Sequence, residues 1–211
     1  IFTLYPEYFP GHLNKGLFGK AKGELWNLQI VNIRDCATDK HKTVDDTPYG
    51  GGNGMVIKAD ILAKSLDKNI KENERIIYLS PRGKLFNHKY AKELSSQKNL
   101  NIICGHFEGV DERVLQSRNI EEVSLGDFVL SGGESAAFVV MDAILRFIPG
   151  IIGNIKSSEE ESFENGLLEY PQFTKPQIWE EKNVPEVLLS GDHAKIKDWR
   201  LSQSEAITRD R

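Results

Sequence analysis

Cysteine is scarce in this sequence of 211 residues, and its scarcity excludes two common ways of stabilising a fold. The two cysteines are Cys36 and Cys104, and a single pair in a chain of this size is typical of reduced thiols. The five histidines, at positions 12, 41, 88, 106 and 193, form no cluster with the spacing of metal ligands. We therefore expect no disulfide framework and no structural zinc, and the spacing assigns no metal ligand.

Long apolar runs are also missing. No stretch approaches the ~20 consecutive apolar residues that a membrane-spanning helix requires. The opening segment, Ile1-Phe2-Thr3-Leu4-Tyr5, is strand-like and lacks the charged-then-apolar order of a signal peptide. These features predict a cytoplasmic protein with no membrane association. Because the first residue is not Met and residues 208–211 resemble an unfinished basic helix, we expect further residues beyond both ends.

The usual phosphate-binding loops are absent. No G-x-x-x-x-G-K-[ST] occurs, and no G-x-G-x-x-G opens a helix after a strand, so a cofactor that lacks phosphate fits better than a nucleotide. The net charge of −4 argues weakly against a nucleic-acid-binding protein. Local basic runs, such as Lys195, Lys197 and Arg200, permit RNA binding without showing it.

Strand-like and helix-like segments alternate through about residue 150, which predicts an α/β domain with a mostly parallel sheet. The expected strands are residues 1–5, 28–33, 75–79, 100–104 and 121–125. The expected helices are residues 7–17, 59–66, 87–96, 110–116 and 134–147. The last helix carries a broad apolar face at 3.6-residue spacing and ends at Pro149-Gly150.

The chain changes character after this helix. Residues 151–175 contain glycines, serines and an acidic run without periodicity, which predicts a flexible interdomain linker over 154–170. Residues 171–211 predict a small, mostly helical domain. Asp192 is a good N-cap for a helix with Ile196 and Trp199 inside and with Lys195, Lys197 and Arg200 outside.

Glycine-containing turns follow three of the expected strands, at residues 78–83, 104–112 and 124–134. In an open α/β sheet, ligands bind at the carboxyl ends of the strands, and glycine there allows close approach of the backbone to a ligand. The three turns together predict a cofactor pocket. Glu108 and Asp127 are the side chains suited to read a ribose.

A fourth glycine-rich segment, Asp45-Asp46-Thr47-Pro48-Tyr49-Gly50-Gly51-Gly52-Asn53-Gly54-Met55, has two interpretations. It is either a surface connection or a loop that orders when substrate binds. Its two aspartates suit either Mg²⁺ or a turn cap. Arg146 and Glu161 are ambiguous in the same way, since each is either a surface charge or a member of a cation and proton-acceptor pair.

Three motifs, taken in order, resemble the bacterial tRNA (guanine-N1)-methyltransferase family (TrmD). They are the segment 45–55, Gly105-x-x-Glu108-Gly109-x-Asp111-Glu112-Arg113, and Gly126-Asp127-x-Val129-Leu130-Ser131-Gly132-Gly133-Glu134. The resemblance implies a SPOUT-type α/β domain over residues 1–153, with a deep trefoil knot over about 78–150. Knots are essentially absent from other proteins, so no pattern of residues predicts one. It also implies S-adenosyl-L-methionine as cofactor, assistance by Mg²⁺, a homodimer with shared active sites, and a tRNA substrate methylated immediately 3′ of the anticodon.

The resemblance also implies roles for individual residues. The cofactor would be bound by the three strand-end turns, at Tyr78, Leu79, Ser80, Pro81, Gly105, Phe107, Glu108, Gly109, Ser124, Leu125, Gly126, Asp127, Phe128, Leu130, Gly132 and Gly133. The tRNA would be bound by Asp45, Tyr49, Gly50, Gly51, Gly52, Ser162, Lys195 and Arg200, with residues 171–211 as a tRNA-binding domain. Glu161 would take the proton from guanine N1, and Arg146 would stabilise negative charge on O6.

This sequence departs from the family pattern at three informative positions. Glu161 stands where the family has aspartate, and Thr47 and Lys175 stand where arginine is usual. Lysine cannot reproduce the bidentate fork of arginine, so some tRNA contacts are in doubt. Two alternatives therefore stay open, a related RNA methyltransferase with another target and a non-catalytic RNA-binding protein of the same fold.

Overall fold

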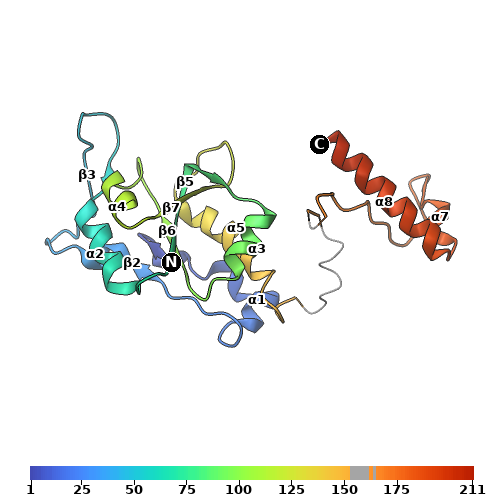
Figure 1. The fold of residues 1–211 in the computed structure, drawn as a ribbon, viewed down its shortest axis with the longest axis horizontal. Helices are drawn as coiled ribbons and strands as arrows, with labels where there is room; N and C mark the ends of the chain where they lie inside the picture. The colour runs from blue at the N-terminus through green and yellow to red at the C-terminus, as the bar shows by residue number, and fades with distance from the viewer. Residues whose placement is uncertain (153–161, 164) are drawn as a thin grey trace. The chain divides into compact units, whose positions relative to one another are not determined.

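A computed structural model describes residues 1–152, 162–163 and 165–211 of the chain. The chain divides into two compact units, Ile1–Gly153 and Asn154–Arg211. Figure 1 shows the first unit as a layered α/β structure around a sheet, and the second with a long helix near the C-terminal end of the chain. Mixed α/β structure with a parallel sheet is confirmed. The three-dimensional course that would make a knot stays a prediction.

The sheet of the first unit has five parallel strands. Their order is β2 (Val31–Asn32), β1 (Phe2–Thr3), β6 (Leu100–Cys104), β5 (Arg75–Leu85) and β7 (Glu121–Ser124). The cores of the predicted strands 75–79, 100–104 and 121–125 are confirmed. The two predicted N-terminal strands are correct in place but much shorter than expected.

Both faces of this sheet are buried. Alternating residues of β5 point to opposite sides: Ile77 and Leu79 join one apolar cluster, and Ile76 and Tyr78 join the other. The first cluster is covered by α3 (His88–Ser95) and α5 (Gly133–Leu145). The second is covered by α2 (Ala59–Asn69) and α4 (Glu112–Ser117), which lie on the other side of the sheet in Figure 1. Strands buried on both faces explain the nearly continuous apolar runs in the sequence.

The predicted helix over residues 7–17 is wrong. The segment instead forms two short 3-10 helices, η1 (Pro6–Tyr8) and η2 (Gly11–Asn14), followed by α1 (Gly16–Ala21). Pro10 has no N–H to donate, and Gly11 and Gly16 adopt φ values of 54° and 60°, which lie outside the right-handed helical region. A third 3-10 helix, η3 (Ile33–Cys36), follows β2.

Strand β5 is interrupted where it runs beside β7. Both Leu79 and Lys84 pair with Val123, so the residues between them bulge out of the ladder. The return to the ladder needs a glycine, because a Cβ at Gly83 would lie 2.2 Å from the backbone nitrogen of Val123. The bulge therefore displaces Ser80, Pro81 and Arg82 to the carboxyl end of the sheet.

The described strands of the second unit form a small antiparallel hairpin, β8 (Ile178–Trp179) and β9 (Lys182–Asn183), which turns through Glu180 and Glu181. The helices α7 (Glu186–Leu189) and α8 (His193–Asp210) follow. The predicted N-cap is confirmed, because the Asp192 carboxylate accepts hydrogen bonds from the backbone N–H groups of Ala194 and Lys195.

At the amino end of the sheet, a polar cluster joins β5, β7 and α3. The Arg75 guanidinium contacts Glu121 at 2.6 Å and Glu93 at 2.7 Å, and the Tyr90 hydroxyl donates to Glu121 at 2.7 Å. The hydrogen bond from Arg75 is the main reason why the pKa of Glu121 lies below its ordinary value of 4.5. Burial, with a smaller effect of the Glu121 hydrogen bond, raises the pKa of Tyr90 to about 12.

We expect Glu121→Gln to lower the free energy of unfolding by about 1 kcal/mol at neutral pH, a small value because this carboxylate is 42% exposed. A lowered folded-state pKa means that the ionised carboxylate stabilises the protein well above pH 4.5 and that this contribution is lost as the pH falls below it. Urea unfolding should therefore show a difference between wild type and variant at pH 7 that shrinks near pH 3.5. Glu24→Gln, at an exposed position, is the control. An equal difference at both pH values would contradict the account.

Candidate active site

The carboxyl ends of β5, β6 and β7 meet at one edge of the sheet, because the strands are parallel. A cleft of about 1430 Å³ opens at this edge. It is larger than the roughly 300–1,000 Å³ of a usual small-molecule site, so it has room for a cofactor together with part of a second reactant.

Fifteen of the sixteen residues predicted to bind the cofactor line this cleft. They come from the three turns, and they are Tyr78, Leu79, Ser80, Pro81, Gly105, Phe107, Glu108, Gly109, Ser124, Leu125, Gly126, Phe128, Leu130, Gly132 and Gly133. The exception is Asp127, which is exposed and does not line the cleft. Of the two candidates for reading a ribose, Glu108 is therefore the one on the cleft wall.

Local hydrogen bonds set the shape of each turn. The Ser124 hydroxyl accepts from the N–H of Gly126 and lies 3.2 Å from its carbonyl oxygen. In the turn after β6, the N–H of Gly109 donates to the His106 carbonyl oxygen, with Phe107 at a φ of 60° and Gly109 at 117°. Positive φ at Gly109 costs little, whereas at Phe107 it is a local strain. The strained residue directs an aromatic ring, 47% exposed, to the cleft.

The glycines of the site have a packing role besides the approach of a ligand that the sequence suggested. A Cβ at Gly133 would lie 2.6 Å from the Cα of Cys104, and a Cβ at Gly105 would lie 2.6 Å from the ring of Tyr78. These positions require glycine because protein segments pack against each other there, in addition to any approach of a ligand. Burial raises the pKa of the Tyr78 hydroxyl, and the charge of Glu122 adds to this effect.

The glycine-rich segment 45–55 lies beside the cofactor turns. Asp45 and Asp46 form β3, which pairs with β4 (Val56–Ile57) as an antiparallel hairpin. Three backbone hydrogen bonds join the second arm of the hairpin to residues 108–111, including one from the N–H of Ile57 to the Gly109 carbonyl oxygen at 2.9 Å. Asp46 accepts from the N–H of Thr47 at 2.8 Å, which is the turn-cap interpretation of this carboxylate.

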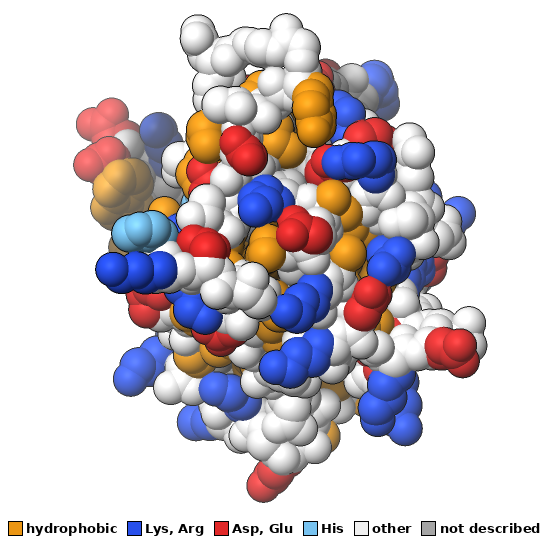
Figure 2. Space-filling view, turned by 90° about the vertical axis from the view of Figure 1, so that its left-hand side faces the viewer, with side chains coloured by type: hydrophobic (Ala, Val, Ile, Leu, Met, Phe, Trp, Pro, Cys, Tyr) orange, Lys and Arg blue, Asp and Glu red, His pale blue; other side chains and the backbone are white. Residues whose placement is uncertain are grey.

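The predicted substrate-binding residues of the hairpin differ in whether they line the cleft. Tyr49 lines the cleft, and its side chain is 99% exposed, so the ring is accessible to a bound substrate. Asp45 and Gly50, Gly51 and Gly52 do not line the cleft. The cleft is also lined by Asp46, one of the two aspartates considered for Mg²⁺, and by Lys58, Arg82 and Arg113, which the sequence did not single out as site residues. Figure 2, which views the face over α2 and α4, shows basic and acidic side chains intermingled.

Charged side chains at the rim of the cleft form ion pairs with one another. The Arg82 guanidinium contacts Glu112 at 2.9 Å and Glu122 at 3.0 Å, and Arg113 contacts Asp111 at 2.7 Å. The hydrogen bond from Arg82 lowers the pKa of Glu112, and the one from Arg113 lowers the pKa of Asp111. In the described part of the chain, no group of three His, Cys, Asp or Glu side chains is arranged to hold a metal ion.

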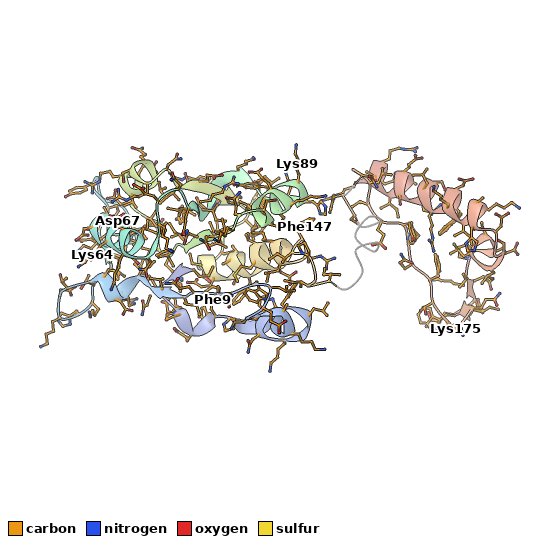
Figure 3. All side chains as sticks on the ribbon, turned by 60° about the horizontal axis from the view of Figure 1, so that its bottom comes forward. Phe9, Lys64, Asp67, Lys89, Phe147 and Lys175 are labelled. Atoms are coloured by element: carbon orange, nitrogen blue, oxygen red, sulfur yellow. The ribbon has the colours of Figure 1, made fainter. Side chains whose placement is uncertain are left out.

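Arg146 lies away from the cleft of its own chain. It is the C-cap of α5, whereas the cleft is at the start of that helix. At ~1.5 Å per residue, the path from Gly133 to Arg146 is roughly 20 Å. The next residue, Phe147, packs against the ring of His88 and under Lys92 of α3, and Figure 3 shows it at this end of the unit near Lys89.

The remaining predicted site residues belong to the second unit, apart from Glu161, which lies outside the described residues. The Ser162 hydroxyl accepts from the N–H of Glu169 at 3.0 Å. Lys195 is mostly exposed and contacts Asp192 at 3.2 Å. Arg200 was expected on the outer face of α8, but this is wrong in part: its guanidinium lies over the ring of Tyr170, 4.7 Å from the centroid, and the residue is half-buried. Figure 3 shows Lys175 at the edge of the same unit.

Comparison with known proteins places these observations in a family. The profile of the family described as tRNA (Guanine-1)-methyltransferase TrmD matches residues 1–211, so the chain belongs to this family. A protein of Pelagibacter ubique (strain HTCC1062), named tRNA (guanine-N(1)-)-methyltransferase, is 72% identical over 210 residues, which cover 99% of this chain and 92% of that protein.

More distant relatives carry the same name. The protein of Bartonella tribocorum is 53% identical, with 100% of this chain and 91% of that protein covered. The protein of Brucella canis is 51% identical, with 100% and 86% covered. The family predicted from the three motifs is confirmed. None of the described helices is long and apolar enough to cross a membrane.

Proposed function

We propose that this protein transfers a methyl group from S-adenosyl-L-methionine to N1 of a guanine in tRNA, at the nucleoside immediately 3′ of the anticodon. The observation that carries the proposal is the cleft: the residues that the family resemblance assigns to the cofactor, drawn from three separate turns, line one cavity. Membership of a family whose members are named for this reaction supports the same conclusion.

The cleft suits the cofactor chemically. S-adenosyl-L-methionine has no phosphate, and the sequence lacks both of the usual phosphate-binding motifs. The glycine-containing turns offer backbone N–H and C=O groups, and Leu79, Leu125 and Leu130 offer apolar surface for an adenine. The Glu108 carboxylate is the wall residue suited to the ribose hydroxyls.

Residues of the chain accept the proton of guanine N1 and stabilise the negative charge that develops on O6. Guanine N1 carries a proton at neutral pH and is a weak nucleophile, so a base must remove that proton as the new N–C bond forms. We assign this role to Glu161. Arg146 then stabilises the negative charge that grows on O6. When bound, the cofactor supplies a methyl group already activated on a sulfonium, and the protein mainly orients the two reactants.

The position of Arg146 supports a homodimer with shared active sites. Because a chain's own Arg146 is roughly 20 Å along α5 from its own cleft, the arginine that meets a given cleft has to come from a second copy. The rim of the cleft provides apolar surface for such a copy, since Phe107, Phe128, Val129 and Leu130 are between 43% and 85% exposed. Exposed apolar patches of this kind mark interfaces. We also propose that the chain forms a deep trefoil knot over about residues 78–150.

The tRNA would approach through the hairpin and the second unit. Tyr49 is an exposed aromatic ring on the cleft wall and suits stacking on a base. Asp45, Gly50, Gly51, Gly52, Ser162, Lys195 and Arg200 stay predicted tRNA contacts, with Arg200 the weakest because it is half-buried against Tyr170. Mg²⁺ stays a prediction from the family, and no step above depends on it. We also propose that the protein is cytoplasmic, because its tRNA substrate is in the cytoplasm.

Shared active sites predict that two inactive variants complement each other. Arg146→Ala removes the cation, and Leu130→Trp fills the cleft at a side chain that is 43% exposed and therefore replaceable without unfolding. Each variant alone should be inactive. A randomly assembled mixture contains about half heterodimers, each with one intact site out of two, so about a quarter of the wild-type activity should return. Co-expression with two affinity tags and a methyl-transfer assay would measure it. No recovery in isolated heterodimers would contradict the shared site.

Substitution of Glu161 tests its proposed role as the base that takes the proton from guanine N1. We expect Glu161→Gln to slow single-turnover methyl transfer by about 10²–10⁴-fold, because the amide cannot accept the proton. Binding of S-adenosyl-L-methionine should be nearly unchanged, and Glu161→Asp should keep substantial activity. Glu160→Gln and Glu169→Gln are the matched controls. If Glu161→Gln reacts at a wild-type rate while one of the controls does not, the base is the other carboxylate.

A further inference from the structure

A buried carboxylate stands behind the cleft and has no part in the chemistry described above. Glu134 is the second residue of α5 and is 3% exposed. The Thr3 hydroxyl donates a hydrogen bond to its Oε1 at 2.5 Å, and Nε2 of His106 lies 2.7 Å from its Oε2. The two carboxylate oxygens thus contact two segments that are distant in the sequence.

Burial of a carboxylate is unfavourable unless its charge is compensated. Here the compensation comes from the two hydrogen bonds and from the amino-terminal turn of α5, where a negative charge is favoured. The network extends further, because the N–H of Tyr5 donates to the Thr3 hydroxyl at 2.9 Å and the Tyr5 ring lies 4.8 Å from the His106 ring. The network therefore joins the end of β1, the turn after β6 and the start of α5.

Two of the cofactor turns meet at this network. The N–H of Gly133 donates to the Gly105 carbonyl oxygen at 2.9 Å, which brings the turn after β7 against the turn after β6. A Cβ at Gly132 would lie 2.3 Å from Cε1 of His106 and 2.8 Å from a carboxylate oxygen of Glu134. The ring and the carboxylate therefore fill the space directly behind Gly132, and both His106 and Gly132 line the cleft.

We propose that Glu134 and His106 are positioning residues that hold the turns 105–109 and 124–133 at the separation required to bind the cofactor. This inference rests on the proposed function, since it takes the cleft as the S-adenosyl-L-methionine site. The proposed base is Glu161, so His106, whose side chain is only 13% exposed, is assigned a positioning role and no proton transfer. Site residues whose supporting contacts are fixed in advance bind their ligand without a further cost of ordering.

The hydrogen bond can be separated from the packing by two substitutions at one position. His106→Leu keeps much of the volume and removes the donor. His106→Gln keeps an N–H group at nearly the position of Nε2 and can still donate to Glu134. We expect His106→Leu to weaken binding of S-adenosylhomocysteine about 10-fold or more and to raise KM for S-adenosyl-L-methionine to match. The kcat at saturating cofactor should stay within about threefold, and His106→Gln should recover affinity to within about threefold.

The control for a general loss of stability is Glu121→Gln, at the opposite end of the same strands. It should lower the melting temperature and leave the dissociation constant of S-adenosylhomocysteine within twofold of wild type. Should His106→Leu not fold, Thr3→Val removes the other hydrogen bond to Glu134 at constant shape. It should then weaken binding severalfold, and Thr3→Ser should restore it.

Calorimetric titration of the protein with S-adenosylhomocysteine separates the outcomes. If wild type does not bind, the proposed function is wrong. If wild type binds and His106→Leu binds within twofold of it, the positioning role alone is overturned. The role is also overturned if His106→Leu and His106→Gln are weakened equally, because packing of the ring would then explain the effect.

Discussion

The close approach of α5 to the end of β6 is the constraint on which the rest of the first unit depends. Gly133 packs directly on the Cα of Cys104, and a Cβ would place an atom 2.6 Å from it. This contact sets the start of α5 against the sheet edge and brings the turn 124–133 to the turn 105–109. Burial raises the pKa of the Cys104 thiol, and the nearby Glu134 carboxylate adds to the effect, as expected for a tightly closed junction.

The same contact determines where Arg146 lies. Since α5 starts at the cleft and continues through thirteen residues, its other end lies away from the cleft of its own chain. A protein that uses this arginine at the cleft must bring it from a second copy. One packing contact thus bears both on the cleft of one unit and on the proposed assembly.

Local patterns in the sequence predicted much of this fold. The apolar run of β5, the apolar face of α5 and the cap at Asp192 were readable because each depends on neighbours within one element. The helix expected over 7–17 failed where Pro10 and Gly11 override the periodicity. Arg200 was misplaced because its partner, Tyr170, is thirty residues away. The motifs located the cleft, but the contact of Glu134 with Thr3 spans 131 residues and has no local signal.

The reaction product tests the proposed methyl transfer to guanine N1 most directly. A tRNA transcript with guanosine immediately 3′ of the anticodon, incubated with the protein and S-adenosyl-L-methionine, would be digested to nucleosides and analysed by mass spectrometry. The account predicts 1-methylguanosine, formed at that one position and absent when the guanosine is replaced. A different methylated nucleoside, or bound cofactor without any methylated product, would contradict it.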